Sequence, residues 1–161
     1  MTKFEDLIPV LSTADVEFIL VGGLAAIVHS SSRATYDVDV VYRRSPENME
    51  RLCRTLAAHS PRLRGAPPGL PFVLDEKTMA FGLNFTLSTD LGDLDLFGEI
   101  PGGGNYDELL PGTEKREIFG HACRVVSLDT LLRLKRSTGR AKDLEATAEL
   151  EEIKRRQEGR F

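Results

Sequence analysis

Apolar positions along the first thirty residues change from helical to strand spacing and back again. The first dozen residues place apolar side chains at intervals of three and four, at Phe4, Leu7, Ile8 and Leu11. This spacing predicts an amphipathic helix. Residues 16–21 form a short apolar run rich in branched side chains, which predicts a buried strand. Gly22 and Gly23 interrupt this run and a second helix is expected over 24–29, so the order is strand, glycine turn, helix.

The next segment alternates between two kinds of side chain. After the polar residues 30–32, the run 37–42 predicts a strand. Its two faces differ, with Val38, Val40 and Tyr42 on one and Asp37, Asp39 and Val41 on the other. Ser45 followed by Pro46 is a typical helix start. The apolar stripe of that helix comprises Met49, Leu52, Cys53 and Leu56.

The second half of the chain predicts two hairpins and two loops. Strands are expected over 81–87, 91–97, 117–119 and 123–126, and they pair in sequence order. Glycine and proline accumulate over 60–71 and 98–112, which predicts loops there.

The C-terminal part is predicted to be helical. Ser127 is expected to cap a helix that ends near Gly139, and a charged helix is expected from Ala141 onward. The element order predicts an α+β fold in which helices flank a small mixed β-sheet. Because no repeat or change in composition divides the sequence, we expect a single domain over 1–161, with its C-terminal helices from about 127.

Composition narrows the class of protein. The chain has 161 residues, 41% of them apolar and 29% charged, which is ordinary for a globular domain. No apolar run approaches the roughly 20 residues that span a bilayer, so we expect no membrane partner. The net charge of −4 argues against a protein that coats nucleic acid by charge alone. Cys53 and Cys123 lack metal-ligand spacing, and we expect reduced, buried thiols in a cytoplasmic protein.

Acidic residues recur at alternate positions of two predicted strands. Asp37 and Asp39 share a face of the earlier strand, and Asp93 and Asp95 share a face of the later one. Aspartate is a poor strand former, so two such pairs need a reason. One interpretation is that both strands simply turn acids to solvent, and it stays open. The other is that the acids converge, in which case they repel one another unless a cation lies between them.

Converging acids of this kind fit a magnesium site. Magnesium prefers hard oxygen ligands and keeps substrate phosphates in its shell. Two such ions can hold the attacking and leaving oxygens of a phosphoryl transfer. We therefore expect Asp37, Asp39 and Asp95 to bind the metal and to be catalytic. Asp95 is preferred because leucines flank it inside the strand, whereas Asp93 follows Gly92 near the turn and is expected to be solvated.

The glycine turn and three cations are candidates for binding a nucleotide. Backbone N–H groups of Gly22 and Gly23, at the start of a helix, can approach a phosphate. Lys135 falls on or beside the apolar stripe of its helix, where it either extends to water or contacts an anion. Arg33, in the polar loop before the first acidic strand, either contacts a phosphate or the acceptor or is an exposed loop cation. Lys142 begins the last helix and either completes the phosphate contact or is solvated.

These motifs together resemble the nucleotidyltransferase superfamily of the polymerase-β type. In that pattern a glycine turn precedes Asp-x-Asp and a third aspartate on a later strand, here Gly22-Gly23, Asp37-Val38-Asp39 and Leu94-Asp95-Leu96. The strings 33–39 and 131–143 look more narrowly like the small bacterial branch that includes the AbiEii-type toxins. The resemblance spans roughly residues 16 to 150. One departure concerns the second turn residue, since many members carry a serine whose hydroxyl contacts a phosphate and Gly23 offers only its N–H.

The resemblance implies a nucleotidyltransferase fold and a magnesium-dependent transfer of NMP from an NTP to a hydroxyl acceptor. Asp37 and Asp39 would bind two magnesium ions with the NTP, Asp95 would bind one of them and help to activate the acceptor, and Lys135 would steady the triphosphate held at the turn. The acceptor would be RNA such as a tRNA end, a protein or a small molecule. A toxin role would make an antitoxin protein a partner. A non-catalytic nucleotide-binding or regulatory module is the alternative, and a purely structural domain is a third.

Overall fold

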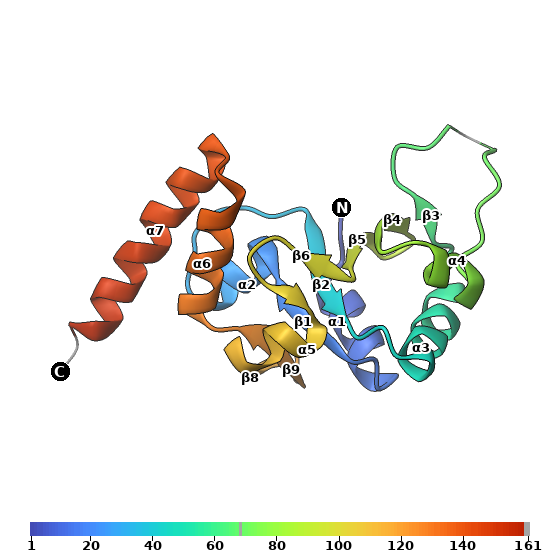
Figure 1. Cartoon of the computed structure of the whole chain (residues 1–161), viewed down its shortest axis with the longest axis horizontal. Helices are drawn as coiled ribbons and strands as arrows, with labels where there is room; N and C mark the ends of the chain where they lie inside the picture. The colour runs from blue at the N-terminus through green and yellow to red at the C-terminus, as the bar shows by residue number, and fades with distance from the viewer. Residues whose placement is uncertain (68, 160–161) are drawn as a thin grey trace.

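The computed structural model describes residues 1–67 and 69–159, except for the side chain of Lys142. Helices surround one seven-stranded sheet (Figure 1), whose strands lie in the order β3-β4-β5-β2-β1-β9-β8. The strands of this sheet are β1 (Phe18–Val21), β2 (Asp37–Tyr42), β3 (Arg62–Leu63), β4 (Asn84–Thr89), β5 (Gly92–Phe97), β8 (Thr113–Ile118) and β9 (His121–Val126). A separate two-stranded hairpin consists of β6 (Glu99–Ile100) and β7 (Gly104–Asn105).

The sheet is mixed, as the sequence predicted. The pairs β1–β2, β3–β4, β4–β5 and β8–β9 are antiparallel, whereas β2–β5 and β1–β9 are parallel. Parallel neighbours cannot be joined by a tight turn, so the chain between β2 and β5 makes a long crossover. This crossover places β2 and β5, which are far apart in the sequence, side by side near the centre of the sheet.

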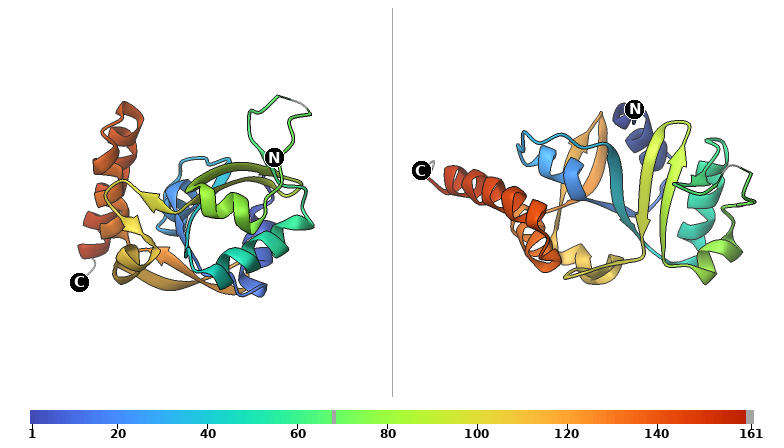
Figure 2. Two further views of the ribbon diagram at one scale, coloured as in Figure 1. Left: turned by 45° about the vertical axis from the view of Figure 1, so that its right-hand side comes forward. Right: turned by 90° about the horizontal axis from the view of Figure 1, so that it is seen from above.

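Helices occupy both ends of the molecule. They are α1 (Phe4–Thr13), α2 (Gly22–Val28), α3 (Pro46–Ala57), α4 (Glu76–Phe81), α5 (Tyr106–Leu109), α6 (Leu128–Thr138) and α7 (Ala141–Glu158), with a 3₁₀ turn at Leu110–Gly112. Figures 1 and 2 show α6 and α7 side by side at one end and α3 and α4 at the other. The short helix α2 packs against β1 and β2 and also contacts α6. Among the described residues, no helix combines the length and the apolar character needed to cross a membrane.

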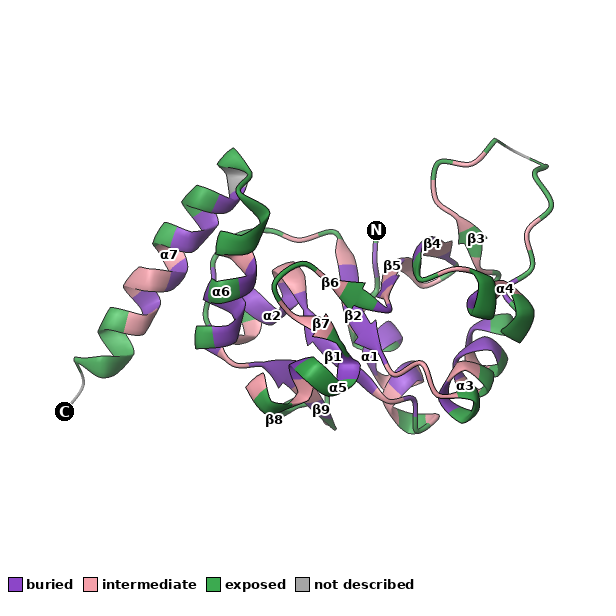
Figure 3. Ribbon diagram, viewed as in Figure 1, coloured by how far each residue is buried: buried purple, intermediate pink, exposed green. Residues whose placement is uncertain are grey.

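The two faces of β2 differ in burial. Val38, Val40 and Tyr42 are fully buried on one face, whereas Asp37 and Asp39 on the other are partly exposed. The β2 ribbon in Figure 3 accordingly carries both buried and intermediate positions. Alternate strand residues point to opposite faces, so this difference follows directly from the sequence pattern. The acid-bearing face therefore stays accessible at the Asp37 end of the strand.

The caps expected from the sequence are present at the start of α3 and at both ends of α6. The side chain of Ser45 accepts a hydrogen bond from the backbone N–H of Asn48 at the start of α3. The side chain of Ser127 accepts one from Thr130 at the start of α6. Gly139 ends α6 with φ of 65°, a left-handed conformation that glycine adopts without strain.

The predicted strand over 81–87 begins too early. Phe81 is instead the last residue of α4. The start of this helix is capped by the side chain of Asp75, which accepts a hydrogen bond from the N–H of Thr78. The strand β4 starts only at Asn84 and continues to Thr89. An aspartate cap upstream of the apolar run was the signal that separates the two elements.

The two predicted loops contain short regular elements. Within 60–71, β3 pairs with β4 and extends the sheet by one edge strand. Within 98–112, β6 and β7 form a small hairpin, and α5 follows with a capping box between Asn105 and Glu108. These elements are two to four residues long, too short to show a hydrophobic period in the sequence.

Candidate active site

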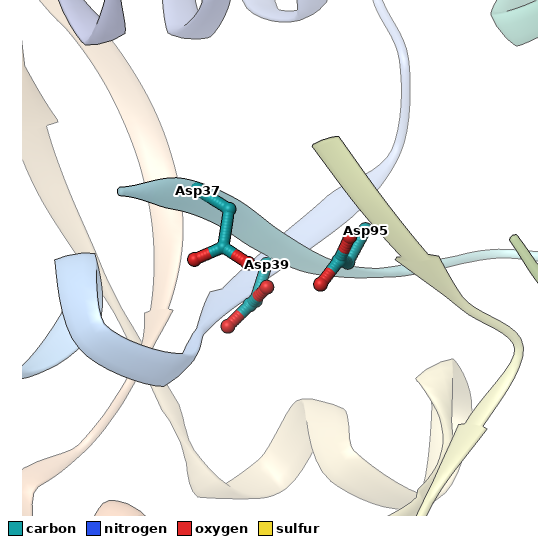
Figure 4. Close-up of side chains that lie close together, drawn as sticks. All are labelled: Asp37, Asp39 and Asp95. Carbon is teal, nitrogen blue, oxygen red and sulfur yellow. The ribbon is translucent and has the colours of Figure 1, made fainter. Parts of the chain in front are cut away.

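Two parallel strands bring four aspartates to one face of the sheet. β2 and β5 pair so that Asp37 lies opposite Asp93 and Asp39 lies opposite Asp95. Because alternate residues of a strand share a face, all four side chains lie on the same side. One carboxylate oxygen each of Asp37, Asp39 and Asp95 lies within 4.8 Å of the other two (Figure 4). The structure thus brings together the three acids that the sequence singled out, and their catalytic role stays a prediction.

Burial and the neighbouring carboxylates disfavour ionisation of Asp37 and Asp39. Burial, followed by the charges of Asp37 and Asp95, raises the pKa of Asp39 to about 8, and the charge of Lys135 acts in the opposite direction. Burial and then Asp95 also raise the pKa of Asp37. Oδ1 of Asp39 is buried and has no hydrogen-bond partner in the part of the chain that the structure describes. Such an oxygen is costly to bury unless a proton or a cation satisfies it.

The donor set fits a divalent cation of the magnesium type. All three groups are carboxylates, the hard oxygen ligands that magnesium prefers. A cation between Asp37, Asp39 and Asp95 would offset their repulsion and give the buried Asp39 oxygen a partner. The cluster is therefore consistent with a divalent metal site, and the number of ions stays a prediction.

The glycine turn lies directly beside the acids. Val21, the last residue of β1, pairs with Asp39, and Gly22 follows with φ of +71°. A Cβ atom on Gly22 would lie 2.2 Å from Oδ2 of Asp39, so both the close approach and the backbone require glycine. A Cβ atom on Gly23 would lie 2.5 Å from Oγ1 of Thr35. Thr35 therefore fills the space that a serine side chain would need at the second turn position.

Two cavities flank the glycine turn. The larger, of about 460 Å³, is lined by Gly22, by Asp39 and by mostly apolar side chains of β5, β6 and α6. The smaller, of about 200 Å³, is lined by Gly23 and Arg33 among others. Lys135 lines both cavities. The glycine turn thus borders a cavity on each side, and Asp39 lines the larger one.

Lys135 is held between this space and a buried carboxylate. Its Nζ lies 3.8 Å from Oδ1 of Asp143, and its side chain is 21% exposed. Asp143 also accepts hydrogen bonds from the Thr138 hydroxyl and from Nε of Arg140. Burial works to raise the pKa of Asp143, but these hydrogen bonds and the two positive charges outweigh it and lower the pKa. Asp143 is therefore ionised at neutral pH and orients the ammonium group that faces Asp39.

Of the other two candidate cations, Arg33 lies outside the acid cluster. Arg33 has a half-exposed side chain whose Nη1 lies 3.7 Å from Oε2 of Glu145 in α7. Glu149 fastens the Arg33 loop to the same helix by accepting hydrogen bonds from the backbone N–H and the hydroxyl of Ser32. The side chain of Lys142 lies outside the described residues. The phosphate contacts of Arg33, Lys135 and Lys142 stay predictions.

Sequence reasoning missed Arg64. This arginine follows β3, and its guanidinium reaches three aspartates, with Nη2 2.8 Å from Oδ1 of Asp95, Nε 3.4 Å from Oδ2 of Asp93 and Nη1 3.6 Å from Oδ2 of Asp37. In the sequence Arg64 was an ordinary member of the predicted loop 60–71. No local signal shows the two-residue strand that carries it to the cluster. Asp93 is, as expected, more exposed than Asp95, 40% against 15%.

Similarity to known proteins is visible in the fold and not in the sequence. No family model matches the chain, and no curated protein is detectably similar to it. The lincosamide antibiotic adenylyltransferase LnuA, solved with lincomycin bound, is similar with a TM-score of 0.60 and 14% identity, over 91% of this chain and 93% of that one. For the antibiotic-resistance factor ANT(2'')-Ia the TM-score is 0.54 and the identity is 13%, over 96% of this chain and 88% of that one. An antigenic nucleotidyltransferase-like protein from Paracoccidioides brasiliensis is similar with a TM-score of 0.54 and 17% identity, over 91% of this chain and 72% of that one.

These similarities confirm the predicted fold. The arrangement of helices around a mixed sheet is that of the solved nucleotidyltransferase structures, and it extends over nearly the whole chain. At this level of identity the likeness concerns the fold, so the narrower resemblance to the AbiEii-type branch stays a prediction.

Proposed function

We propose that this protein is a magnesium-dependent nucleotidyltransferase, which transfers NMP from an NTP to a hydroxyl group of a small-molecule acceptor and releases pyrophosphate. One observation carries the proposal: three carboxylates from two parallel strands meet beside a glycine turn that leaves no room for a side chain. The fold shared with nucleotidyltransferases supports it.

Asp37, Asp39 and Asp95 are the residues that would hold magnesium. When bound, the metal would offset the negative charge of the triphosphate and of the departing oxygen. The protein's own contribution is to keep the three carboxylates assembled, which it does by building them into two adjacent strands. Rigid placement of charged groups before the substrate arrives is a major part of catalysis in phosphoryl transfer.

Asp95 is the candidate general base. In the transfer, the acceptor oxygen bonds to the α-phosphorus of the NTP, and the bond from that phosphorus to the bridging oxygen of the β-phosphate breaks. The electron pair of the broken bond leaves with pyrophosphate, and the hydroxyl proton passes to the carboxylate of Asp95. A carboxylate within hydrogen-bond reach of the hydroxyl can accept this proton.

The glycine turn and Lys135 would position the nucleotide. Backbone N–H groups at Gly22 and Gly23 would contact the phosphates, because both residues lie at the start of α2, where backbone N–H groups have no acceptor within the helix. The ammonium group of Lys135 borders both cavities and would oppose the charge of the triphosphate. Arg33 and Lys142 would complete these contacts.

Two considerations favour a small-molecule acceptor. LnuA is an antibiotic adenylyltransferase, and ANT(2'')-Ia is an antibiotic-resistance factor, so two proteins of the same fold are associated with antibiotics. The acidic balance of the chain also disfavours an extended RNA footprint, which relies on Lys and Arg contacts to phosphates. A tRNA or protein acceptor follows from the sequence resemblance alone, and so does a toxin role with an antitoxin partner. RNA and protein acceptors are therefore tested in parallel with small molecules.

The test follows a radioactive label from nucleotide to product. Purified protein is incubated with each α-labelled NTP and magnesium, and in separate reactions with a lincosamide, an aminoglycoside, total RNA or cell-extract protein. We expect a labelled small molecule and released pyrophosphate, both lost in Asp39→Asn and retained in the matched control Asp129→Asn on the surface of α6. Label in RNA or protein would replace the small-molecule acceptor. Magnesium-dependent NTP binding without transfer would indicate the non-catalytic module, and absence of such binding would refute the proposal.

A further inference from the structure

One arginine lies over the acid cluster. Arg64 follows β3 at the edge of the sheet, and its backbone N–H donates a hydrogen bond to the carbonyl of Thr86 at 2.9 Å. Its side chain extends across β4 and β5 to Asp37, Asp93 and Asp95, and it is 27% exposed. A single positive charge is therefore shared by three carboxylates.

The pairing is electrostatic and poorly hydrogen-bonded. Nη2 of Arg64 donates to the carbonyl of Leu87 at 2.6 Å. Nε of Arg64 and Oδ1 of Asp95 are both buried without a hydrogen bond to any described residue, although Nη2 lies 2.8 Å from that oxygen. Optimised arginine–carboxylate pairs instead form two parallel N–H···O bonds. The short separation gives attraction, whereas the missing alignment shows that the guanidinium is not locked to the acids.

Arg64 and a metal ion would need the same two carboxylates. Two of its three partners, Asp37 and Asp95, belong to the cluster that can hold a divalent cation. Magnesium draws its ligands to about 2.1 Å and repels a neighbouring positive charge. The guanidinium and the ion therefore compete for these two carboxylates.

We propose that Arg64 is an exchangeable counter-ion, which neutralises the acid cluster in the metal-free protein and withdraws from Asp37 and Asp95 when a divalent cation binds. The inference rests on the metal role in the proposed function. Two partners outside the metal cluster, Asp93 and the Leu87 carbonyl, retain the guanidinium after it withdraws.

The exchange has a consequence for the order of binding. Arg64 keeps the acids assembled without metal, and it raises the free metal concentration at which the site fills. A triphosphate brings negative charge of its own, so metal and nucleotide together displace the guanidinium more readily than metal alone.

The test measures metal binding without nucleotide or acceptor. Mn²⁺ is the probe, followed by calorimetry and by the electron paramagnetic resonance signal of the free ion. Removal of the competing charge should make Mn²⁺ bind at least about fivefold more tightly to Arg64→Ala and Arg64→Gln, the lower end of typical coupling between two sites. The matched control is Arg62→Ala, because Arg62 contacts the Ser60 carbonyl and none of the described aspartates, and its affinity should equal that of the wild type.

Thermal unfolding supplies an independent readout. In EDTA, Arg64→Ala should unfold at a lower temperature than the wild type, because three aspartates lose their counter-ion. Added Mn²⁺ should raise its Tm by more than it raises that of the wild type. Arg64→Gln keeps most of the side chain and decides the question if Arg64→Ala does not fold.

The possible outcomes separate this inference from the proposed function. Unchanged or weaker Mn²⁺ binding by a folded Arg64 variant overturns the counter-ion proposal, even if nucleotidyl transfer is found. Tighter Mn²⁺ binding upholds it even if no acceptor is ever labelled. If neither the wild type nor the variants bind Mn²⁺, the counter-ion proposal fails, whereas the proposed function is decided by the labelling test, in which the metal is supplied together with the NTP.

Discussion

Asp39→Asn should stabilise the metal-free protein, and by more at high pH than at low pH. The pKa of Asp39 rises from its ordinary value of 3.8 to about 8 in the folded protein, mainly through burial. Between these values the folded state keeps a proton that the unfolded state has already lost. The free energy of unfolding therefore falls as the pH rises through this range. Asparagine carries no such proton, so the variant escapes this loss.

The magnitude follows from the size of the shift. Each unit of pKa difference corresponds to about 1.36 kcal/mol, so a rise from about pH 6 to about pH 8 costs the wild type up to about 2–3 kcal/mol. Asp37 and Asp95 share the same repulsion, and part of this cost remains in the variant. We therefore expect the lead of Asp39→Asn over the wild type in free energy of unfolding to grow by about 2 kcal/mol between about pH 6 and about pH 8, or about 4–8 °C in Tm for a chain of this length.

The assay is urea unfolding followed by circular dichroism, at about pH 6, 7 and 8, with EDTA and then with excess magnesium. Asp129→Asn on α6 is the matched control; it loses an exposed ion pair with Lys154, so its offset from the wild type should be small and the same at the three pH values. Magnesium should reverse the order, because the wild type gains stability from binding it and Asp39→Asn gains little. A wild-type stability that is flat between about pH 6 and 8, or a variant that is weaker at about pH 8 in EDTA, would refute the reasoning.

Three further changes test the surroundings of the acids. Gly22→Ala should lower the free energy of unfolding by about 2 kcal/mol or more, because the added methyl group meets Asp39 and φ is positive. A free energy from urea unfolding that stays within about 0.5 kcal/mol of the wild type contradicts this. Gly23→Ser should destabilise alone and recover when combined with Thr35→Ala, which empties the same space; a double variant as unstable as the single one, measured by Tm, argues against that packing. Asp143→Asn should raise KM for NTP several-fold with a smaller change in kcat, because Lys135 loses its orienting partner, and an unchanged KM counts against this role.

The acid cluster was predictable because the strand period fixes which side chains share a face. Asp37 and Asp39 stand at alternate positions between valines, and Asp95 stands between leucines. The fold class was predictable because further local signals mark the helices. Ser45 and Ser127 cap the starts of α3 and α6, and Gly139 ends α6. These signals are local, and each is carried by a few neighbouring residues.

The contribution of Arg64 was not predictable because it depends on contacts between distant segments. Arg64 reaches the acids only because β3 pairs with β4, and a two-residue strand leaves no periodic pattern. Thr35 was missed for a related reason, because its place beside Gly23 depends on how the loop before β2 folds back over the turn. In both cases the residue type gave no sign of its neighbour.

The pairing of Asp39 with Asp95 links metal affinity to the alignment of two strands. The two residues are directly opposite each other in the β2–β5 ladder, so the alignment of the strands sets the distance between their Cα atoms. Substitutions that loosen the packing beneath them, at Val40 or Leu94 for example, should therefore displace the carboxylates relative to each other well before the strands separate. In such variants the loss of bound cation would precede any change in secondary structure, and titration with a metal would detect a misaligned sheet that spectroscopy still records as intact.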